Sequence, residues 1–206
     1  MWWREIEAQA RSGRRFCSSD ESLDIHPDAI VDGNACLNAK YGPIVIGART
    51  RICPGAYLEG PLEIGDDCLI GNLVVVRGPA RIASGTRIGF ATEIKNAIIA
   101  ERVTIGPQCF VADSKIEAGA YLGAQVRTSN HRLDGKTVSV IVEGALIDTG
   151  LEKLGCLIGA GAALGIQVIV LPGREVAPGS VFAPRITIEK NLPAGRYRPV
   201  QQLESF

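Results

Sequence analysis

Branched aliphatic residues recur at every sixth position along much of the chain. Nine of them follow one another at this spacing without a break: Ile46, Ile52, Leu58, Ile64, Ile70, Val76, Ile82, Ile88 and Ile94. The spacing returns after one-residue slips near Ile99 and Ile116 and, after an interruption, from Ile158 to Phe182. A period of six matches neither the 3.6-residue period of a helix nor the two-residue period of a strand. It is typical of a solenoid in which each hexapeptide forms one flat side of a coil.

Three such sides make a coil of eighteen residues, so residues eighteen apart are expected to stack. The pattern places Ile46, Ile64 and Ile82 on one wall. The second wall then carries Ile52, Ile70 and Ile88, and the third carries Leu58, Val76 and Ile94. Each wall becomes a short parallel sheet, and the inward aliphatic columns bury surface that no single repeat could bury alone. The one-residue deficits near Ile99 and Ile116 indicate shortened corners.

The predicted fold class is therefore an all-β solenoid, a left-handed parallel β-helix with a short N-terminal helix and one long projecting loop. We divide the chain into an N-terminal helix and cap (1–24), the β-helix (25–190) with an inserted loop (129–156), and a C-terminal cap or tail (191–206). The N-terminal segment predicts an amphipathic helix, and both terminal segments are expected to cover the open ends of the solenoid, which are unpaired sheet edges.

Composition excludes several classes of partner. The 206 residues hold twenty-two basic and twenty-two acidic side chains, so there is no charge footprint for nucleic acid or an anionic membrane. No run reaches the length of a membrane span, and the N-terminus lacks the apolar core of a signal peptide, so we expect a cytoplasmic protein. The six cysteines include no CxxC pair, which predicts reduced thiols and no metal site.

One segment interrupts the repeat and collects candidate binding residues. Residues 129–156 must project from a corner of the coil, and long loops on rigid scaffolds often carry function. The polar side chains in and beside this loop are Arg127, Asn130, His131, Arg132, Asp134, Lys136 and Lys153. Together they are suited to bind an anionic, hydroxyl-rich ligand, although solvated loop charges would give the same composition.

The loop and the coils together resemble a known superfamily, the left-handed β-helix acyltransferases. The runs that carry the resemblance are SNHRLDGK (129–136), DTG (148–150), KLG (153–155), Ile158-Gly159, Gly165-Ile166 and LPG (171–173). They are similar to the acetyltransferase domain of bifunctional sugar-1-phosphate nucleotidylyltransferase/N-acetyltransferases, of the glucosamine-1-phosphate acetyltransferase type. The similarity covers roughly Ile25 to Asn191 and is strongest from Glu93 to Gly173.

This resemblance implies a homotrimer that binds acetyl-CoA and an amino-sugar 1-phosphate in clefts between neighbouring chains. Asn130 matches a loop asparagine near the reacting groups, and Lys136 matches a residue that meets substrate phosphate. Arg127, Arg132 and Lys153 are further candidates for substrate binding. The residues expected to line the cofactor channel are Ala124, Gly165, Ile166 and Ala183.

The chain departs from the family pattern at the catalytic base. Pro107 stands where the family has its histidine, and Phe110 stands where an aromatic partner is often tyrosine. The two histidines of the chain are His26, at an outward position of the first hexapeptide, and His131 in the loop. His131, beside Asn130, is a candidate substitute base or phosphate ligand, or has neither role.

Two functions therefore remain open. About forty-five residues precede the regular coils, too few for a nucleotidylyltransferase domain, so any nucleotidyl transfer is expected from another protein. The loop motifs favour a CoA-dependent acyltransferase acting on an amino-sugar phosphate or nucleotide sugar, with His131 or a substrate-activated route replacing the lost base. The missing histidine and tyrosine favour an inactive trimeric β-helix that binds sugar phosphates or serves as scaffold and partner for a nucleotidylyltransferase.

Overall fold

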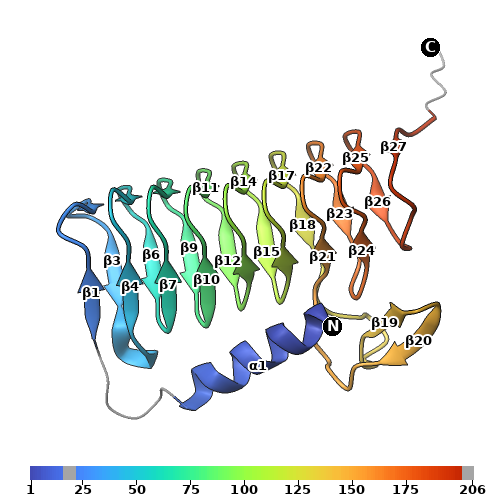
Figure 1. Cartoon of the computed structure of the whole chain (residues 1–206), viewed down its shortest axis with the longest axis horizontal. Helices are drawn as coiled ribbons and strands as arrows, with labels where there is room; N and C mark the ends of the chain where they lie inside the picture. Colours follow the sequence, from blue (N-terminus) through green and yellow to red (C-terminus); the bar gives the residue numbers. More distant parts are fainter. Residues whose placement is uncertain (16–21, 201–206) are drawn as a thin grey trace.

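The computed structural model describes residues 1–15 and 22–200, and within them the chain winds into a prism of parallel strands (Figure 1). Three sheets form its walls, and consecutive strands belong to different walls. Wall A contains β1 (Leu23–Ile25), β4 (Ile44–Ile46), β7 (Leu62–Ile64), β10 (Ala80–Ile82), β13 (Ile98–Ile99), β16 (Lys115–Ile116), β21 (Leu157–Ile158) and β24 (Glu175–Val176).

Wall B contains β2 (Ile30–Val31), β5 (Arg51–Ile52), β8 (Leu69–Ile70), β11 (Arg87–Ile88), β14 (Thr104–Ile105), β17 (Tyr121–Leu122), β22 (Ala163–Leu164), β25 (Val181–Phe182) and β27 (Arg196–Tyr197). Wall C contains β3 (Cys36–Asn38), β6 (Tyr57–Glu59), β9 (Val75–Arg77), β12 (Glu93–Lys95), β15 (Phe110–Ala112), β18 (Arg127–Thr128), β23 (Ile169–Val170) and β26 (Thr187–Ile188). A 3₁₀ turn, η1 (Ala39–Tyr41), follows β3. The predicted left-handed parallel β-helix of hexapeptide repeats is thus confirmed.

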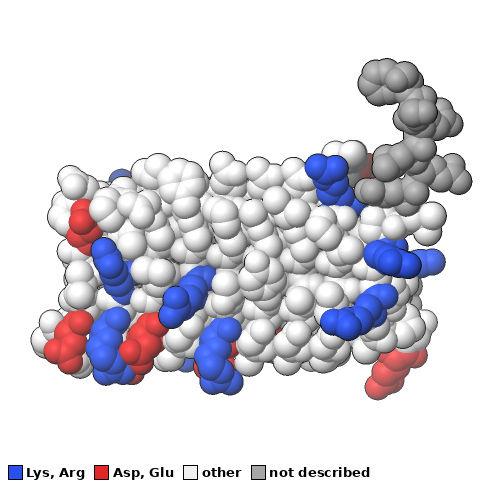
Figure 2. Space-filling view, turned by 90° about the horizontal axis from the view of Figure 1, so that it is seen from above, with Lys and Arg blue, Asp and Glu red and all other residues white. Residues whose placement is uncertain are grey.

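The outer face of wall B carries few charges at its centre. Figure 2 looks onto the prism from above and shows charged side chains toward the two ends and along one edge, with an uncharged area between them. Successive coils place Thr104, Tyr121 and Ala163 side by side at outward positions in this region. This area offers no electrostatic obstacle to contact with another neutral surface.

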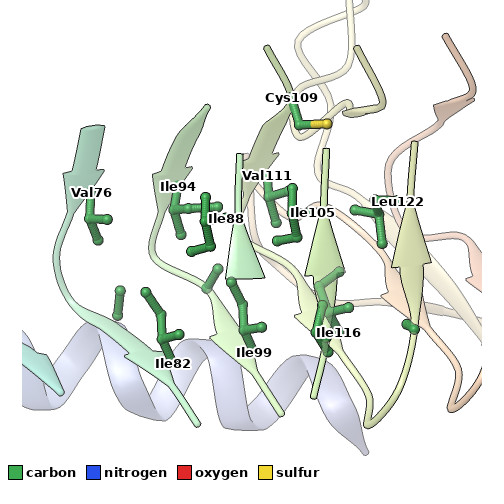
Figure 3. Packing of buried hydrophobic residues seen from close by; sticks show 14 of the residues in the cluster. Val76, Ile82, Ile88, Ile94, Ile99, Ile105, Cys109, Val111, Ile116 and Leu122 are labelled. Carbon is green, nitrogen blue, oxygen red and sulfur yellow. The ribbon is translucent and has the colours of Figure 1, made fainter. Parts of the chain in front are cut away.

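The predicted columns of aliphatic residues form the core. Ile46 pairs with Ile64 and Ile64 with Ile82 on wall A, and the other two walls repeat this register. Figure 3 shows members of the columns in the middle coils, among them Val76, Ile82 and Ile88 from the three walls, pointing into one interior. Cys109 lies among them, and its thiol is buried like those of Cys53, Cys68 and Cys156. Each coil covers the apolar surface of the next, which is the stabilising principle of a repeat fold.

The shortened corners lie at the edge where wall C turns into wall A. In two early coils this edge contains Gly60-Pro61 and Gly78-Pro79. In the next two coils it contains Asn96 and Asp113, whose φ angles are 42° and 49°. Asn and Asp tolerate this left-handed conformation better than most residues, and it turns the chain within one residue fewer.

The inserted loop leaves the prism at the same edge and contains a feature that the sequence did not predict. Its centre is an antiparallel hairpin of β19 (Ser139–Val142) and β20 (Ala145–Asp148), which pair only with each other. Figure 1 shows the hairpin projecting beside the prism, next to the start of the N-terminal helix.

The helix α1 (Trp2–Arg15) confirms the predicted N-terminal helix but differs from the end cap that we expected. It lies along the flank of several coils rather than over the first coil (Figure 1). Glu5 pairs with Lys115, and the Gln9 amide lies within 3.3 Å of the carbonyl oxygens of Pro79 and Ala97. The helix lies along the flank because its apolar face packs against the inserted loop, which is far from the first coil.

The C-terminal segment adds a last, irregular turn to the solenoid. Leu192 bridges to Val176 on wall A, and β27 pairs with β25 on wall B. The Tyr197 ring stacks on Phe182 with ring centroids 4.8 Å apart. The stacked ring covers part of the last apolar column. Cys17 and residues 201–206 lie outside the described residues.

Candidate functional site

A column of three polar residues anchors the loop to the prism. The Asn96 Nδ2 donates to one Asp113 carboxylate oxygen at 2.7 Å, and the Asn130 Nδ2 donates to the other at 2.5 Å. Asp113 and Asn96 are buried, and the Asn96 Oδ1 has no partner among the described residues. Because a buried carboxylate must be hydrogen-bonded to persist, this polar column (Asn96, Asp113 and Asn130) fixes where the loop begins.

The next residue, His131, lies at the mouth of a cavity of about 590 Å³ at the base of the loop. Its Nδ1 is 3.4 Å from the carbonyl oxygen of Glu152, and its backbone forms an isolated bridge with Lys153 on the segment that returns to the prism. A carbonyl oxygen only accepts, so this contact favours the tautomer with the proton on Nδ1 and a free lone pair on Nε2. The cavity, called here the loop pocket, is lined by Ser129, His131, Arg132, Leu133, Asp134, Leu171, Pro172, Arg174 and Glu189.

The two arginines of the loop pocket differ in how their charge is balanced. Arg132 forms a bidentate pair with Asp134, with N–O distances of 2.9 and 2.6 Å. This pairing holds the pKa of Asp134 far below its usual range and largely neutralises Arg132. Arg174 donates instead to the carbonyl oxygens of Pro172 and Ser139, and burial lowers its pKa. Among the described residues it forms no direct ion pair, although the nearby Glu175 carboxylate favours its charged form, so the guanidinium can still meet an anion in the pocket.

Sequence reasoning missed Arg174 and Glu189 as members of this site. The signal for Arg174 was present, because it directly follows the LPG run at 171–173 that contributed to the family resemblance. Glu189 had no such signal, since it comes from the last regular coil and reaches the loop pocket only through the stacking of the coils.

The residues expected to line the cofactor channel gather at the other edge of wall C, where wall B turns into wall C. Ala124, Gly165, Ile166 and Ala183 occupy this edge in successive coils. A Cβ on Gly165 would lie 2.7 Å from the Pro184 nitrogen, so glycine allows the coils to approach closely. Beside them runs a ladder of hydrogen-bonded side chains, Gln108, Gln125, Gln167 and Arg185.

Pro107 stands at this same edge, one coil before Ala124. Next to it lies a shallow cavity of about 710 Å³ that includes Glu93, Cys109, Phe110 and Arg127. Glu93 is paired with Arg77, and burial raises the pKa of the Cys109 thiol. No histidine lines this cavity, so the place where the resemblance expects a base holds none of the usual kind.

The remaining candidates are spread over three places. Arg127 lies in the shallow cavity and donates to the Gln108 carbonyl oxygen. Lys136 is exposed in the loop. Lys153 lines a larger cleft of about 820 Å³ between α1 and the prism, together with Glu152, Lys95 and the buried part of the polar column. Of the proposed substrate-binding residues, a single chain therefore brings together only Asn130 and Arg132, at the base of the loop.

His26 lies in the first coil, exposed, with its Nδ1 accepting the Asp28 backbone N–H at 3.1 Å. It is remote from the inserted loop because it belongs to the first coil, and it is exposed, as its outward hexapeptide position indicated. Among residues 1–15 and 22–200 no cluster of side chains could hold a metal ion. Within the same ranges, no helix has the length and apolar character required to cross a bilayer.

Comparison with known proteins shows to which family the chain belongs. Residues 43–78 match the model of the bacterial transferase hexapeptide (six repeats). The chain is 46% identical to "Uncharacterized acetyltransferase YaiX" of Escherichia coli O6:K15:H31 (strain 536 / UPEC), over 98% of this chain and 88% of that protein. It is 32% identical to the "Bifunctional sugar-1-phosphate nucleotidylyltransferase/acetyltransferase" of Sulfurisphaera tokodaii, over 80% of this chain but 41% of that protein.

Among solved structures, the UDP-N-acetylglucosamine O-acyltransferase of Moraxella catarrhalis RH4 is 16% identical with a TM-score of 0.46, over 79% of this chain and 70% of that one. A likeness at this level has no bearing on activity. The relative that this chain matches almost from end to end, together with the repeat model, decides the assignment. The chain belongs to the hexapeptide-repeat transferase family.

Proposed function

We propose that this protein is a CoA-dependent acetyltransferase whose acceptor is the amine of an amino-sugar phosphate or nucleotide sugar. The printed names of the relatives support acetyl transfer, and one of them also carries a sugar-1-phosphate activity. The observation that carries the proposal is the loop pocket, in which the His131 imidazole lies beside Arg174, an arginine that forms no direct ion pair among the described residues.

His131 is proposed as the general base. Its Nε2 would take a proton from the acceptor amine as the nitrogen attacks the thioester carbonyl carbon. The C–S bond would then break, and the imidazolium would return the proton to the leaving sulfur, so that CoA departs as a thiol. The Glu152 carbonyl, in contact with Nδ1, would hold the ring in the required tautomer. Asn130, fixed by Asp113 next to His131, would orient the reacting groups.

Arg174 is proposed as the principal contact for substrate phosphate. Its guanidinium is held in place by two carbonyl oxygens and keeps its charge, whereas Arg132 is already paired with Asp134. A fixed, unpaired guanidinium suits phosphate because it presents several donors in one plane. Arg132, Lys136 and Lys153 would supply weaker electrostatic attraction from the loop.

Acetyl-CoA is proposed to lie along the opposite edge of wall C, at Ala124, Gly165, Ile166 and Ala183. These residues and His131 lie at different edges of the same wall, so we assign the two edges of one chain to different active sites. The edge of a neighbouring chain would have to face the loop, as in the proposed homotrimer. The uncharged centre of wall B is compatible with close packing between copies.

A cytoplasmic location remains a prediction. The five cysteines that the structure describes are free thiols, which suits a reducing compartment that also supplies acetyl-CoA.

Calorimetric titration of the protein with acetyl-CoA, followed by an assay of released thiol with glucosamine 1-phosphate and galactosamine 1-phosphate, tests the proposal. Binding with turnover supports it. His131→Ala should then lower kcat by the roughly 10²- to 10⁴-fold typical of a lost general base, with acetyl-CoA affinity nearly unchanged. His26→Ala is the matched control and should retain full activity. A wild-type rate in His131→Ala would remove His131 from the mechanism.

One set of observations favours the alternative function, an inactive sugar-phosphate-binding protein or partner of a separate nucleotidylyltransferase. Pro107 and Phe110 supply no acid or base at the edge where the family resemblance expects one. The same titration separates the two functions, because sugar-phosphate binding without acetyl-CoA binding would support the alternative alone.

A further inference from the structure

A second hydrophobic core lies outside the prism, between the N-terminal helix and the inserted loop. Trp2, Trp3 and Ile6 contribute from α1 and are 7%, 7% and 2% exposed. Val140 contributes from β19, Val138 from the position just before it, and Leu154 from the segment that returns to the prism; these three are 1% exposed or less. Two buried indole rings account for much of this contact, since tryptophan buries more apolar surface than any other side chain.

The hairpin depends on this second core for its position. Strands β19 and β20 pair only with each other and extend none of the three walls. An isolated two-stranded hairpin is at best marginally stable in water, so its order must come from contacts outside the pair, mainly the second core and also the Arg174 hydrogen bond to the Ser139 carbonyl oxygen. In the described part of the chain, α1 supplies three of the six buried members of that packing.

The second core is connected directly to the loop pocket. The backbone N–H of Leu154, a member of the core, donates to the Asn130 carbonyl oxygen at 3.0 Å. On the other side, the Trp2 Nε1 donates to the Glu175 carboxylate at 2.9 Å, and Glu175 directly follows Arg174. The helix therefore contacts structure on both sides of the pocket while Glu5 and Gln9 fasten it to the coils.

The prism core is separate from this arrangement. Among the described residues, none of those that fill the solenoid comes from α1 or from the hairpin, and the prism meets the second core with outward residues of wall A such as Ile98 and Leu157. Loss of the helix contacts should therefore release the loop without unfolding the coils, since each coil is stabilised by its neighbours.

We infer that α1 is a positioning element for the catalytic loop, in which Trp2 and Trp3 hold the hairpin so that Asn130, His131 and Arg174 keep their geometry. This inference rests on the proposed function for its effect on catalysis but not for its effect on loop order. Low-stability elements next to an active site are often ordered by such remote contacts.

The test is amide hydrogen exchange on the full-length protein, comparing wild type with Trp2→Ala/Trp3→Ala. Peptides within 138–154 should exchange at least about tenfold faster in the variant, while peptides from β5 to β8, which lie outside the contacts that α1 makes with Pro79, Ala97, Lys115 and the second core, keep their protection. Ala8→Gln, an exposed substitution on the same helix, should leave both regions unchanged. Val140→Ala should reproduce the faster exchange from the hairpin side if the double variant fails to fold.

The catalytic readout is a comparison of kcat and KM. A displaced loop should lower kcat about tenfold or more while the KM for acetyl-CoA stays close to wild type, because the proposed donor channel lies at the other edge of wall C. Unchanged protection of 138–154 in both variants would overturn the inference, and so would wild-type kcat in a variant whose loop has lost protection. If wild type itself transfers no acetyl group, the proposed function fails, and the exchange experiment still decides whether α1 orders the loop.

Discussion

At the scale of single residues, Asp113 links the corner of the prism to the loop. It is 5% exposed, adopts a φ of 49°, and accepts an amide hydrogen bond at each carboxylate oxygen. Asp113 thus combines burial, a positive φ and two accepted hydrogen bonds, and no other residue type preserves all three properties.

Asp113→Ala should lower the free energy of unfolding by roughly 2–4 kcal/mol, because two amide donors lose their acceptor and alanine disfavours a positive φ. Urea denaturation followed by circular dichroism measures this loss. Asp113→Asn, which keeps one acceptor oxygen and tolerates the backbone conformation, should lose less. Equal stability of the alanine variant and wild type would contradict the structural role of the column.

The Cys156 thiol gives the protein a pH dependence of its own. Full burial raises its pKa to about 12 from the ordinary value of 9.0. The folded state therefore holds this proton more tightly than the unfolded state, so the contribution is complete below pH 9 and is lost as the pH rises from 9 toward 12. Unfolding midpoints measured between pH 8 and 11 should fall more steeply for wild type than for Cys156→Ala. Parallel curves for the two proteins would rule out this contribution.

At the scale of elements, each strand is held by its coil neighbours rather than by its own length. Most strands span two or three residues, which is too short for independent stability. Their order comes from register, in which an inward aliphatic residue meets its equivalents above and below. The hairpin of the inserted loop lacks such neighbours, which is why it depends on α1.

A central column residue should therefore be far more costly to truncate than an outward residue of similar type. Ile94 is fully buried between Val76 and Val111, so Ile94→Ala should destabilise the protein by about 2–5 kcal/mol through lost contacts and a residual cavity. Val45→Ala, at an outward position of β4 that is 36% exposed, should cost less than about 1 kcal/mol. Chemical denaturation of both variants checks this, and similar losses would contradict the assigned facing of the strands.

At the scale of the whole molecule, wall C separates the proposed donor channel from the loop pocket. If the active site joins two chains, a His131→Ala chain keeps an intact edge and an Ala124→Trp chain keeps an intact loop. Mixtures of the two inactive variants, unfolded and refolded together, should then regain about one quarter of wild-type activity from random assembly of a cyclic trimer. Each variant refolded alone is the control. No recovery in the mixture, with assembly confirmed by sedimentation, would place the site within one chain.

Much of the scaffold could be predicted because its period is local. The spacing of Ile46, Ile64 and Ile82 fixes both the length of a coil and the wall on which each residue lies, and the shortened corners followed from the same count. The loop pocket was only partly predictable. His131 and Arg132 lie in the inserted segment, but Glu189 reaches the pocket through stacking of coils far apart in sequence.

The solenoid, its register and the position of the inserted loop follow from the amino-acid sequence alone, because they depend on a spacing that recurs in every coil. Three other arrangements depend on how the chain packs: α1 lies along the flank, the loop contains a hairpin packed on Trp2 and Trp3, and the loop pocket and the proposed donor channel occupy different edges of wall C. These arrangements arise from single contacts between distant segments, such as Trp2 with Glu175, and no period in the chain encodes them.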